Sequence, residues 1–321
     1  MKKFNLLTLL CAILLAGVMQ SCNQAPVIEG ENYSFQDGMI VFDEPARVEG
    51  QQSMLGFAAE PIPVVRVGFI GLGMRGPGAV NRFTHLEGVE IKGLCDLEQS
   101  NVDKCQEILA QANLPKAEGY VGPEAYKELC ERDDIDLIYI ATDWVHHVPI
   151  AVYAMEHGKH VAVEVPAATS VEECWQLVDT SERTRRHCMM LENCVYDFFE
   201  LTTLNMAQHG LFGEVIHAEG AYIHNLDPYW KNYYEGWRYE FNKVNRGDVY
   251  PTHGLGPACQ VLNIHRGDKM NTLISMDTKA FNGLKVAEQH GETGYTNGDH
   301  TFTLIQTEKG KVIEIQHNVV T

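Results

Sequence analysis

The stretch that decides the fold reads Val64-Val65-Arg66-Val67-Gly68-Phe69-Ile70-Gly71-Leu72-Gly73-Met74-Arg75-Gly76. An apolar, β-branched run of this length predicts a buried parallel strand. The glycines after it form the pattern G-x-G-x-x-G where the strand would pass into a helix. Gly71 permits the tight turn, Gly73 lets the backbone approach a pyrophosphate, and Gly76 allows close helix packing. The sequence therefore predicts a doubly wound α/β domain that binds a dinucleotide.

An acidic residue indicates which dinucleotide is bound. The strand over residues 89–95 ends at Asp96, about twenty residues after Gly76. A carboxylate in this place typically binds the ribose hydroxyls. It favours NAD over NADP, because a 2′-phosphate would face a like charge. We therefore expect NAD as the cofactor.

Further strands of the same sheet are expected at residues 135–142, 160–163 and 189–193, with helices at 149–157 and 171–186. Ligands of open parallel sheets bind at the carboxyl ends of the strands. The residues after the strand at 135–142 are therefore candidates for cofactor contact: Trp144, Val145, His146 and His147. His146 and His147 are equally well explained as structural residues at the start of a helix.

The composition limits the number of domains and the classes of partner that we expect. A chain of 321 residues favours two domains. The formal charge is −18, because 43 Asp and Glu outnumber 25 Lys and Arg, and such a surface makes nucleic acid an unsuitable partner. The nine cysteines form no C-x-x-C pair and no zinc-type spacing with histidine, so we expect neither a disulfide framework nor a metal site.

The N-terminus has the pattern of an export signal. Met1-Lys2-Lys3 precedes an apolar run that extends to Val18, and Ser21-Cys22 resembles a bacterial lipoprotein cleavage site. We expect an exported protein, lipid-anchored through Cys22 in the bacterial envelope; the alternative is a secreted protein in which Cys22 is incidental. The expected organisation is a signal peptide at 1–21, a tether and arm at 22–60, a Rossmann domain at 61–195 and a substrate domain at 196–321.

The chain resembles a known family at several motifs. The glycine motif, the segment from His147 to Val161 and a Glu-x-Pro triplet are similar to the Gfo/Idh/MocA superfamily, in which a Rossmann domain is followed by an α+β domain with an open, mostly antiparallel sheet. Most members carry a catalytic Lys inside the triplet, where this chain has Val165. Glu164-Val165-Pro166, the segments 189–193 and 220–224, and Tyr250-Pro251-Thr252-His253-Gly254 resemble one branch, glycoside hydrolase family 109.

The resemblance implies an activity and a set of site residues. Family members release terminal α-linked N-acetylgalactosamine from glycans with tightly held NAD. The residues implied to contact NAD are Met74, Arg75, Asp96, Trp144, Val145, His146, His147, Glu164, Val165 and Asn193. Those implied to line the sugar are Tyr222, Arg238, Tyr250, Pro251, Thr252 and His253.

The implied chemistry is a transient oxidation at C3, elimination, water addition and re-reduction, rather than displacement by a carboxylate pair. We expect His253 to transfer the proton at the glycosidic oxygen or at C2, because imidazole can take and give a proton near neutrality. Tyr250 and Tyr222 would orient hydroxyls or assist. A loop histidine that only makes structural hydrogen bonds is the simpler alternative for His253, and ordinary strand packing is the alternative for Tyr222.

Two other functions stay open. A Gfo/Idh/MocA-type sugar dehydrogenase would accumulate NADH, although Val165 argues against it; a lipid-anchored sugar-binding module would cleave nothing. A homo-oligomer is also left open. The last segments, 301–307 and 312–321, predict a hairpin around Gly310. The family resemblance implies a longer chain, and a truncated one is expected to expose an unpaired strand edge.

Overall fold

The structure is a computed structural model that describes residues 33–47, 51–229 and 236–319. The chain divides into two compact units between Glu49 and Gly50. In the first unit, β1 (Tyr33–Gln36) and β2 (Met39–Phe42) pair antiparallel. The predicted signal peptide and Cys22 lie outside the described residues.

The second unit begins with the predicted parallel sheet. Its six strands run in the order β5-β4-β3-β6-β7-β8, and every neighbouring pair is parallel. This order, with the chain leaving in opposite directions from β3, confirms the doubly wound fold. The strands are β3 (Val65–Ile70), β4 (Val89–Asp96), β5 (Glu118–Val121), β6 (Leu137–Ile140), β7 (His160–Val163) and β8 (Cys188–Met190).

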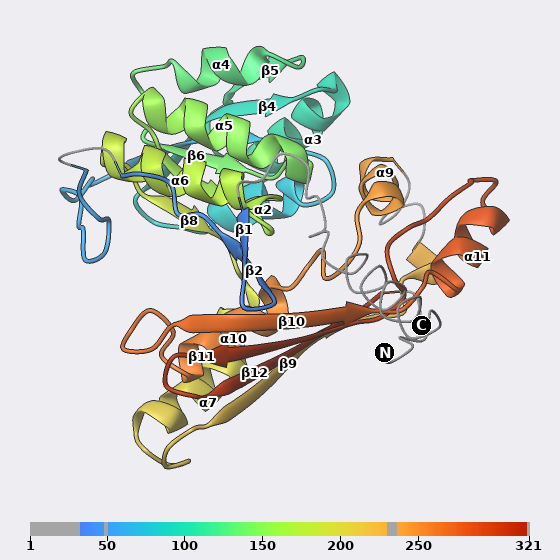
Figure 1. Cartoon of the computed structure of the whole chain (residues 1–321). Helices are drawn as coiled ribbons and strands as arrows, with labels where there is room; N and C mark the ends of the chain where they lie inside the picture. The colour runs from blue at the N-terminus through green and yellow to red at the C-terminus, as the bar shows by residue number, and fades with distance from the viewer. Residues whose placement is uncertain (1–32, 48–50, 230–235, 320–321) are drawn as a thin grey trace, which may run out of the picture. The chain divides into compact units, whose positions relative to one another are not determined.

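Helices cover both faces of this sheet (Figure 1). Ile138 and Ile140 of β6 pack with the helices on one face, and Tyr139 between them packs on the other, because side chains alternate along a strand. One face carries α2 (Gly76–Phe83) and α3 (Gln99–Gln111). The other carries α4 (Ala125–Cys130), α5 (Trp144–Glu156) and α6 (Val171–Thr184).

The predicted start of one helix at Pro149 was wrong, because α5 begins at Trp144. Asp143 caps it: its Oδ1 accepts a hydrogen bond from the backbone N–H of His146 at 3.2 Å. The helix therefore starts directly at the carboxyl end of β6. This brings Trp144 to the edge of the sheet where ligands bind.

A second sheet follows, in the order β10-β11-β12-β9. Its strands are β9 (His217–Ile223), β10 (Met270–Asp277), β11 (Thr301–Thr307) and β12 (Val312–Asn318). The pairs β10–β11 and β11–β12 are antiparallel and β12–β9 is parallel, which confirms a mostly antiparallel sheet. The hairpin was predicted correctly, and its second strand, β12, lies between β11 and β9.

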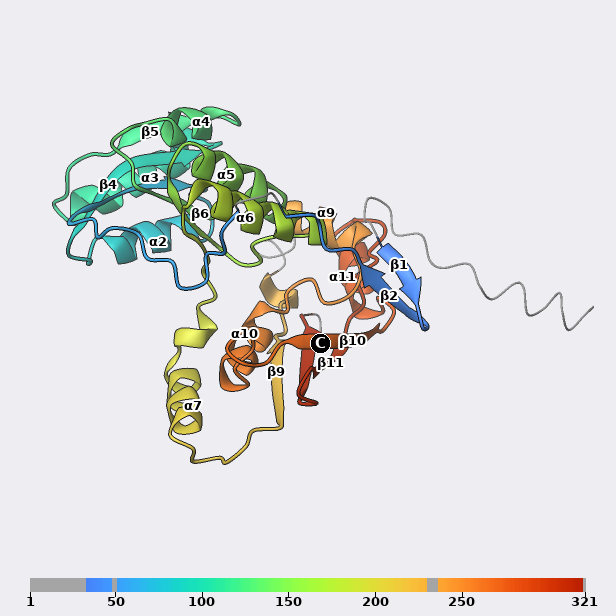
Figure 2. The same cartoon turned by 60° about the vertical axis from the view of Figure 1, so that its left-hand side comes forward.

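One face of this sheet is covered by helices. Ala258 and Leu262, in and after α10 (Thr252–Val261), pack against Ile305, Ile313 and Ile315 of the sheet. Figure 2 shows α10 and α7 (Phe198–Gln208) beside β9. The remaining helical segments are η1 (Cys194–Tyr196), η2 (Asp227–Tyr229), α9 (Trp237–Val244) and α11 (Asn282–Gln289).

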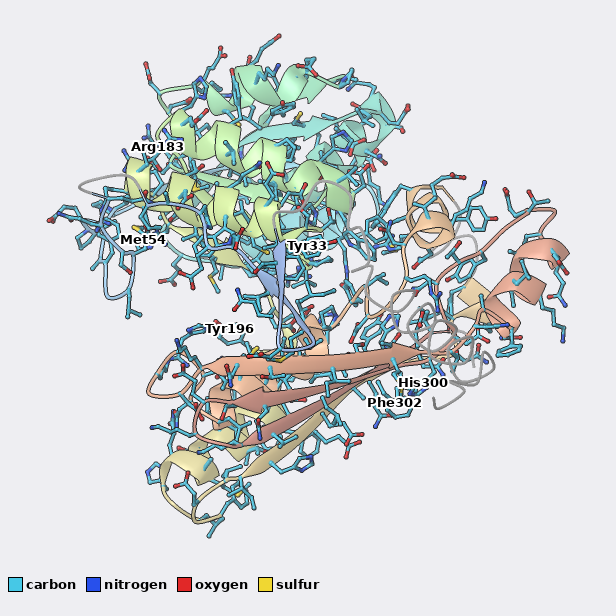
Figure 3. All side chains as sticks on the ribbon, in the orientation of Figure 1. Tyr33, Met54, Arg183, Tyr196, His300 and Phe302 are labelled. Carbon is cyan, nitrogen blue, oxygen red and sulfur yellow. The ribbon has the colours of Figure 1, made fainter. Side chains whose placement is uncertain are left out.

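The side chains of β11 alternate between the core and solvent. Thr303 and Ile305 are buried, whereas Phe302 and Leu304 are 45% and 48% exposed. Figure 3 shows Phe302 beside His300, and their ring centroids are 4.3 Å apart. Over the residues that the structure describes, every helix is too short or too polar to cross a membrane.

Candidate active site

The glycine turn after β3 has the geometry that a dinucleotide requires. Gly71 has φ +89°, and a Cβ there would lie 2.6 Å from the backbone of Ala141. A Cβ on Gly76 would overlap the carbonyl of Gly71. A Cβ on Gly73, in contrast, would meet no described atom within 4 Å. Two glycines therefore hold the turn together, and the third leaves open space at the N-terminus of α2, where a pyrophosphate binds.

Asp96 stands at the end of β4 and holds the same turn. Its Oδ2 accepts a hydrogen bond from the N–H of Leu72 at 2.5 Å. Its Oδ1 accepts from the N–H of Glu98 and from Nδ2 of Asn101, both at 2.9 Å. A carboxylate has about four acceptor positions, so one is left for a ribose hydroxyl. The turn and Asp96 together fit NAD.

A pocket joins residues from the two halves of this unit. Met74 and Arg75 from the glycine turn and Trp144 from α5 line one part of it. Tyr222, Arg238 and Tyr250, from the second half of the chain, line the rest. Residues expected to contact NAD thus lie next to residues expected to contact the sugar.

Aromatic rings fix the shape of this pocket. The ring of Trp144 stacks on Tyr250, with centroids 5.5 Å apart and an interplanar angle of 21°. Trp144 also makes edge contacts with Trp237 and Phe241 of α9, each at 5.0 Å. Trp144 is only 5% exposed, so much of its ring is used to pack the two halves together.

A second group of rings surrounds Tyr222. Its centroid lies 4.9 Å from that of Tyr250, 5.3 Å from His253 and 5.9 Å from His317. Burial and the neighbouring His300 and His224 lower the pKa of His317 to about 4, so its imidazole is neutral at physiological pH. The three predicted catalytic residues, Tyr222, Tyr250 and His253, thus form one cluster.

His253 is held by a buried carboxylate. Its Nδ1 lies 2.7 Å from Oε1 of Glu192, and both side chains are less than a tenth exposed. Burial would raise the pKa of Glu192, but the hydrogen bonds from His253 and the N–H of Cys194 outweigh it and lower the pKa. Glu192 is therefore ionised and can only accept, so Nδ1 of His253 carries the proton. The lone pair of the neutral imidazole is then on Nε2.

Cys194 shares the same ring nitrogen. Its Sγ lies 3.3 Å from Nδ1 of His253. Burial and the charge of Glu192 raise the pKa of the thiol to about 11. A nucleophile–histidine–carboxylate triad uses two different ring nitrogens and an activated nucleophile. Cys194 meets neither condition, so this group is not a catalytic triad.

Tyr250 is a proton donor rather than a base in this setting. Burial and the nearby Tyr222 raise its pKa, against the opposing charges of Arg75 and Arg238. Arg238 lies with its guanidinium carbon 4.1 Å from the ring centroid of Trp237. The phenol of Tyr250 and the guanidinium of Arg238 can both donate hydrogen bonds to sugar hydroxyls.

Other predicted residues have structural partners. Both ring nitrogens of His147 face backbone carbonyls, of Pro166 at 2.7 Å and of Thr142 at 3.3 Å, and the residue is 1% exposed. Val165 is also buried, at 4%. Val145 is 49% exposed, and the side chain of His146 is 62% exposed although its Nδ1 bonds to the carboxylate of Asp143. Glu164 accepts a hydrogen bond from the hydroxyl of Tyr139 at 2.7 Å, and Asn193 is exposed.

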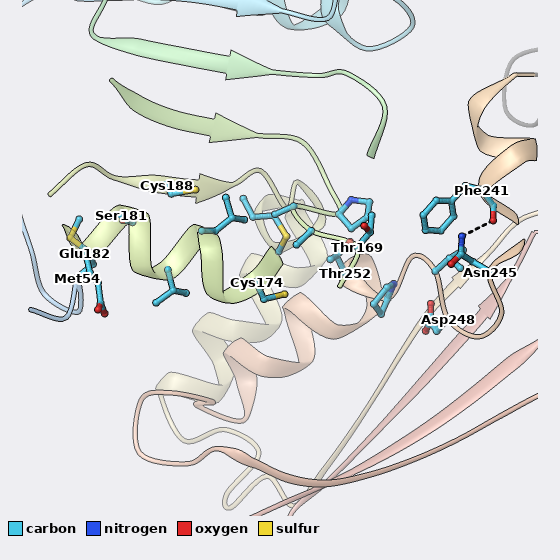
Figure 4. Close-up of a pocket in the computed structure, with 18 of the residues that line it drawn as sticks. Met54, Thr169, Cys174, Ser181, Glu182, Cys188, Phe241, Asn245, Asp248 and Thr252 are labelled. Atoms are coloured by element: carbon cyan, nitrogen blue, oxygen red, sulfur yellow. Dashed lines mark hydrogen bonds between the residues drawn. The ribbon is translucent and has the colours of Figure 1, made fainter. Parts of the chain in front are cut away.

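Pro251 and Thr252 line a different, largely apolar cavity of about 620 Å³ (Figure 4). It is bounded by α6, β8 and the segment that links α9 to α10. Asp248 also lines it; burial raises the pKa of this carboxyl to about 6, and its Oδ2 lacks a hydrogen-bond partner among the described residues. The backbone N–H of Tyr250 donates to its Oδ1 at 3.1 Å.

Sequence reasoning missed Glu192 and Cys194 as parts of the site. Glu192 carried a signal that could have identified it, because it follows β8 at the carboxyl end of a parallel strand. Cys194 carried no comparable signal, since its thiol meets His253 only through tertiary packing.

Comparisons with known proteins agree with this geometry. Residues 65–192 match the family model described as the oxidoreductase family with an NAD-binding Rossmann fold. Residues 196–321 match the model described as the glycosyl hydrolase 109 C-terminal domain. The chain is thus similar to glycosyl hydrolase family 109 over its second half and to NAD-binding oxidoreductases over its Rossmann domain. The dinucleotide of its Rossmann domain is accordingly NAD, as the sequence predicted.

Relatives within family 109 are similar along most of this chain. "Glycosyl hydrolase family 109 protein 1" of Bacteroides fragilis is 63% identical over 281 residues, which are 86% of this chain and 61% of that protein. "Glycosyl hydrolase family 109 protein 4" of Phocaeicola vulgatus is 55% identical over 336 aligned positions, which are 100% of this chain and 64% of that protein. The chain thus spans less than two thirds of these relatives' length.

Solved structures share the fold at low sequence identity. An NAD-binding oxidoreductase from Klebsiella pneumoniae matches with a TM-score of 0.64 and 18% identity, over 80% of this chain and 67% of that one. An apo scyllo-inositol dehydrogenase from Lactobacillus casei matches with a TM-score of 0.62 and 14% identity, over 81% and 70%. These likenesses concern the arrangement of the two sheets.

Proposed function

We propose that this protein is an NAD-dependent glycosidase that releases terminal α-linked N-acetylgalactosamine from glycans. The observation that carries the proposal is the pocket in which Met74 and Arg75 of the glycine turn meet Tyr222, Arg238 and Tyr250. Beside it, the ring of His253 contacts those of Tyr222 and Tyr250 and is held by Glu192.

NAD, when bound, supplies the chemistry of accepting a hydride from a sugar carbon and returning it. The protein's own residues bind the sugar and move protons. His253 transfers the proton through Nε2: its lone pair can accept the proton from C2, and the imidazolium so formed can donate that proton to the glycosidic oxygen. Glu192 keeps that lone pair available by accepting a hydrogen bond from the Nδ1–H of His253. Its negative charge stabilises the imidazolium that forms.

The neighbouring side chains orient the sugar. Tyr250, which stays protonated, donates a hydrogen bond to a sugar hydroxyl. Arg238 offers a planar set of donors, and the aromatic walls of the pocket exclude water around the reacting carbons. Tyr222 contacts both Tyr250 and His253 and either binds a hydroxyl or assists the proton transfer.

An assay with p-nitrophenyl α-N-acetylgalactosaminide, with and without added NAD, tests the proposal. We expect nitrophenol release without accumulation of NADH. Accumulation of NADH would instead identify a sugar dehydrogenase. If neither nitrophenol nor NADH appeared, the result would favour a sugar-binding module.

His253→Ala is expected to reduce turnover by about 10²–10⁴-fold, the usual contribution of a general acid or base. His209→Ala is the matched control, because His209 is exposed at the end of α7 and bonds only to the carbonyl of Asn205 in the described structure. Full turnover by His253→Ala would overturn the role of His253.

We also propose that the protein is exported and lipid-anchored through Cys22, on the basis of its N-terminal sequence. Metabolic labelling with a radioactive fatty acid should mark the unmutated protein and leave Cys22→Ser unlabelled. Equal labelling of both would refute the anchor.

A further inference from the structure

Three side chains that the sequence places far apart form a compact set of metal ligands. Glu192 and Cys194 follow β8, and His253 lies in α10. One ligand atom from each lies within 4.8 Å of the other two. The sequence predicted no metal site, but that prediction concerned only ligands at short spacing. Contact between η1 and α10 brings these three together in space.

The distances match the size of a zinc site. Zn–S is about 2.3 Å and Zn–N about 2.0–2.1 Å, so a tetrahedral ion holds its sulfur and nitrogen ligands about 3.5 Å apart. The observed separation between Sγ of Cys194 and Nδ1 of His253 is 3.3 Å. The 2.7 Å between Nδ1 and Oε1 of Glu192 is a hydrogen-bond distance, so this oxygen is not the one that a metal would use.

The other carboxylate oxygen points to a missing ligand. Glu192 is 5% exposed, and its Oε2 is buried without a hydrogen bond of 3.5 Å or less in the part of the chain that the structure describes, although the carboxylate also interacts with the side chain of Thr252. An ionised, buried oxygen that lacks a partner is costly. A cation bound between Oε2, Sγ and Nδ1 would remove this cost.

We propose that Glu192, Cys194 and His253 form a binding site for a thiophilic divalent cation such as Zn²⁺. Thiolate, imidazole and carboxylate are the ligand types that zinc takes, and three protein ligands leave a fourth position open. The thiol of Cys194 releases its proton when the metal binds. His253 stays neutral, and its proton moves from Nδ1 to Nε2 as the metal takes the lone pair at Nδ1.

Such binding would also inhibit the reaction, and this consequence rests on the proposed function. With a proton on Nε2 and the metal on Nδ1, His253 can no longer accept a proton from the sugar. A thiophilic metal would therefore act as a reversible inhibitor that a chelator removes. The binding itself can be measured without any turnover.

Titration of the protein with Cd²⁺, a spectroscopic substitute for Zn²⁺, tests the site. We expect an ultraviolet thiolate-to-metal charge-transfer band, saturation at one site-specific Cd²⁺ per chain and release of one proton. Cys194→Ser should abolish this band. Cys174→Ser is the matched control and should retain it, because Cys174 is exposed and outside the cluster.

A second variant keeps the test decisive if Cys194→Ser does not fold. Glu192→Gln should keep the band but weaken Cd²⁺ binding at least about tenfold, since loss of even an outer partner of a metal site costs about 10–100-fold. Absence of the band in the unmutated protein, its persistence in Cys194→Ser, or unchanged affinity in Glu192→Gln would each overturn the site. None of these readouts depends on glycosidase activity.

Discussion

At the scale of single residues, the centre of the site is a histidine whose chemistry is set by its neighbours. The sequence pointed to His253, Tyr250 and Tyr222, and the structure brings their rings together. The sequence could not show that Glu192 holds His253, because the two residues are sixty-one positions apart. A motif identifies residue types; the partner that fixes a tautomer depends on the fold.

Glu192→Gln should lower kcat by about 10- to 100-fold, because a hydrogen bond to a charged group contributes about 1.5–3 kcal/mol. The amide still fits beside Nδ1 but cannot stabilise an imidazolium by charge. We expect KM to change less than kcat. Steady-state kinetics with a chelator present, to exclude inhibition by metals, measures this.

Glu240→Gln, on the exposed surface of α9, serves as the control for that experiment. An unchanged kcat in Glu192→Gln would show that the carboxylate does not support His253.

Asp248 should make stability depend on pH. Its pKa is about 6 in the folded protein against 3.8 for the free side chain, because burial disfavours the charge. Between about pH 4 and pH 6 the folded state therefore holds a proton that the unfolded state has lost, and stability falls as pH rises through this window. The loss is at most about 3 kcal/mol.

Asp248→Asn removes this dependence. The free energy of unfolding of the variant minus that of the unmutated protein should therefore be larger at pH 7 than at pH 4. Urea unfolding of both proteins at the two pH values measures the difference. The lowered pKa of His317 makes the folded protein less stable in acid. Both proteins carry His317, so this effect cancels in the comparison. An equal difference at both pH values would contradict the role of Asp248.

At the scale of elements, two glycines hold a strand and a helix in direct backbone contact. A Cβ on Gly220 of β9 would overlap the backbone of Gly254 in α10, and a Cβ on Gly254 would lie 2.8 Å from the backbone N of Ala221. Neither neighbour is a flexible side chain that could move away. This contact positions Tyr222, two residues after Gly220, beside His253.

Gly220→Ala should destabilise the protein by about 1–3 kcal/mol, the usual cost of overpacking. It should also reduce turnover, because separating β9 from α10 moves Tyr222 away from His253. Urea unfolding and the nitrophenyl assay together check this, and wild-type values in both would refute the argument.

Gly73→Ala should behave in the opposite way. Its Cβ meets no described atom within 4 Å, so stability should be unchanged. The methyl group would fill the space that the pyrophosphate approaches, and we expect NAD to bind at least about tenfold more weakly, which corresponds to about 1.4 kcal/mol. Calorimetric titration with NAD measures the affinity; undiminished binding would show that the pyrophosphate lies elsewhere.

At the scale of the whole second unit, the Rossmann half was far easier to predict than the half that follows. The strand–glycine–helix pattern and Asp96 lie in local sequence, and the structure has them where they were expected; in the second half the same holds only for the hairpin of β11 and β12. The parallel pairing of β12 with β9 joins residues 95 positions apart. No local pattern encodes that pairing, so the central place of β12 in the sheet could not be predicted from the sequence.

Trp144 links the two halves of this unit, and Trp144→Ala should cost about 3–5 kcal/mol in stability. Its ring packs on Trp237, Phe241 and Tyr250. We expect thermal unfolding to broaden or to separate into two transitions as the halves uncouple. Phe302→Ala, on the exposed face of β11, is the control and should change stability far less. A single sharp transition at the original temperature would contradict this role.

The place of β12 has a consequence for the order in which the protein forms as it leaves the ribosome. Within the described chain, β9 pairs with β12 alone, and β12 is synthesised long after it. The Rossmann half can fold as soon as β8 has emerged, since domains generally form from the N-terminus during synthesis. The strand that carries Tyr222, however, must wait for Val312–Asn318 before it has a strand to pair with. The glycine turn is therefore complete while the opposite wall of the pocket is still being translated.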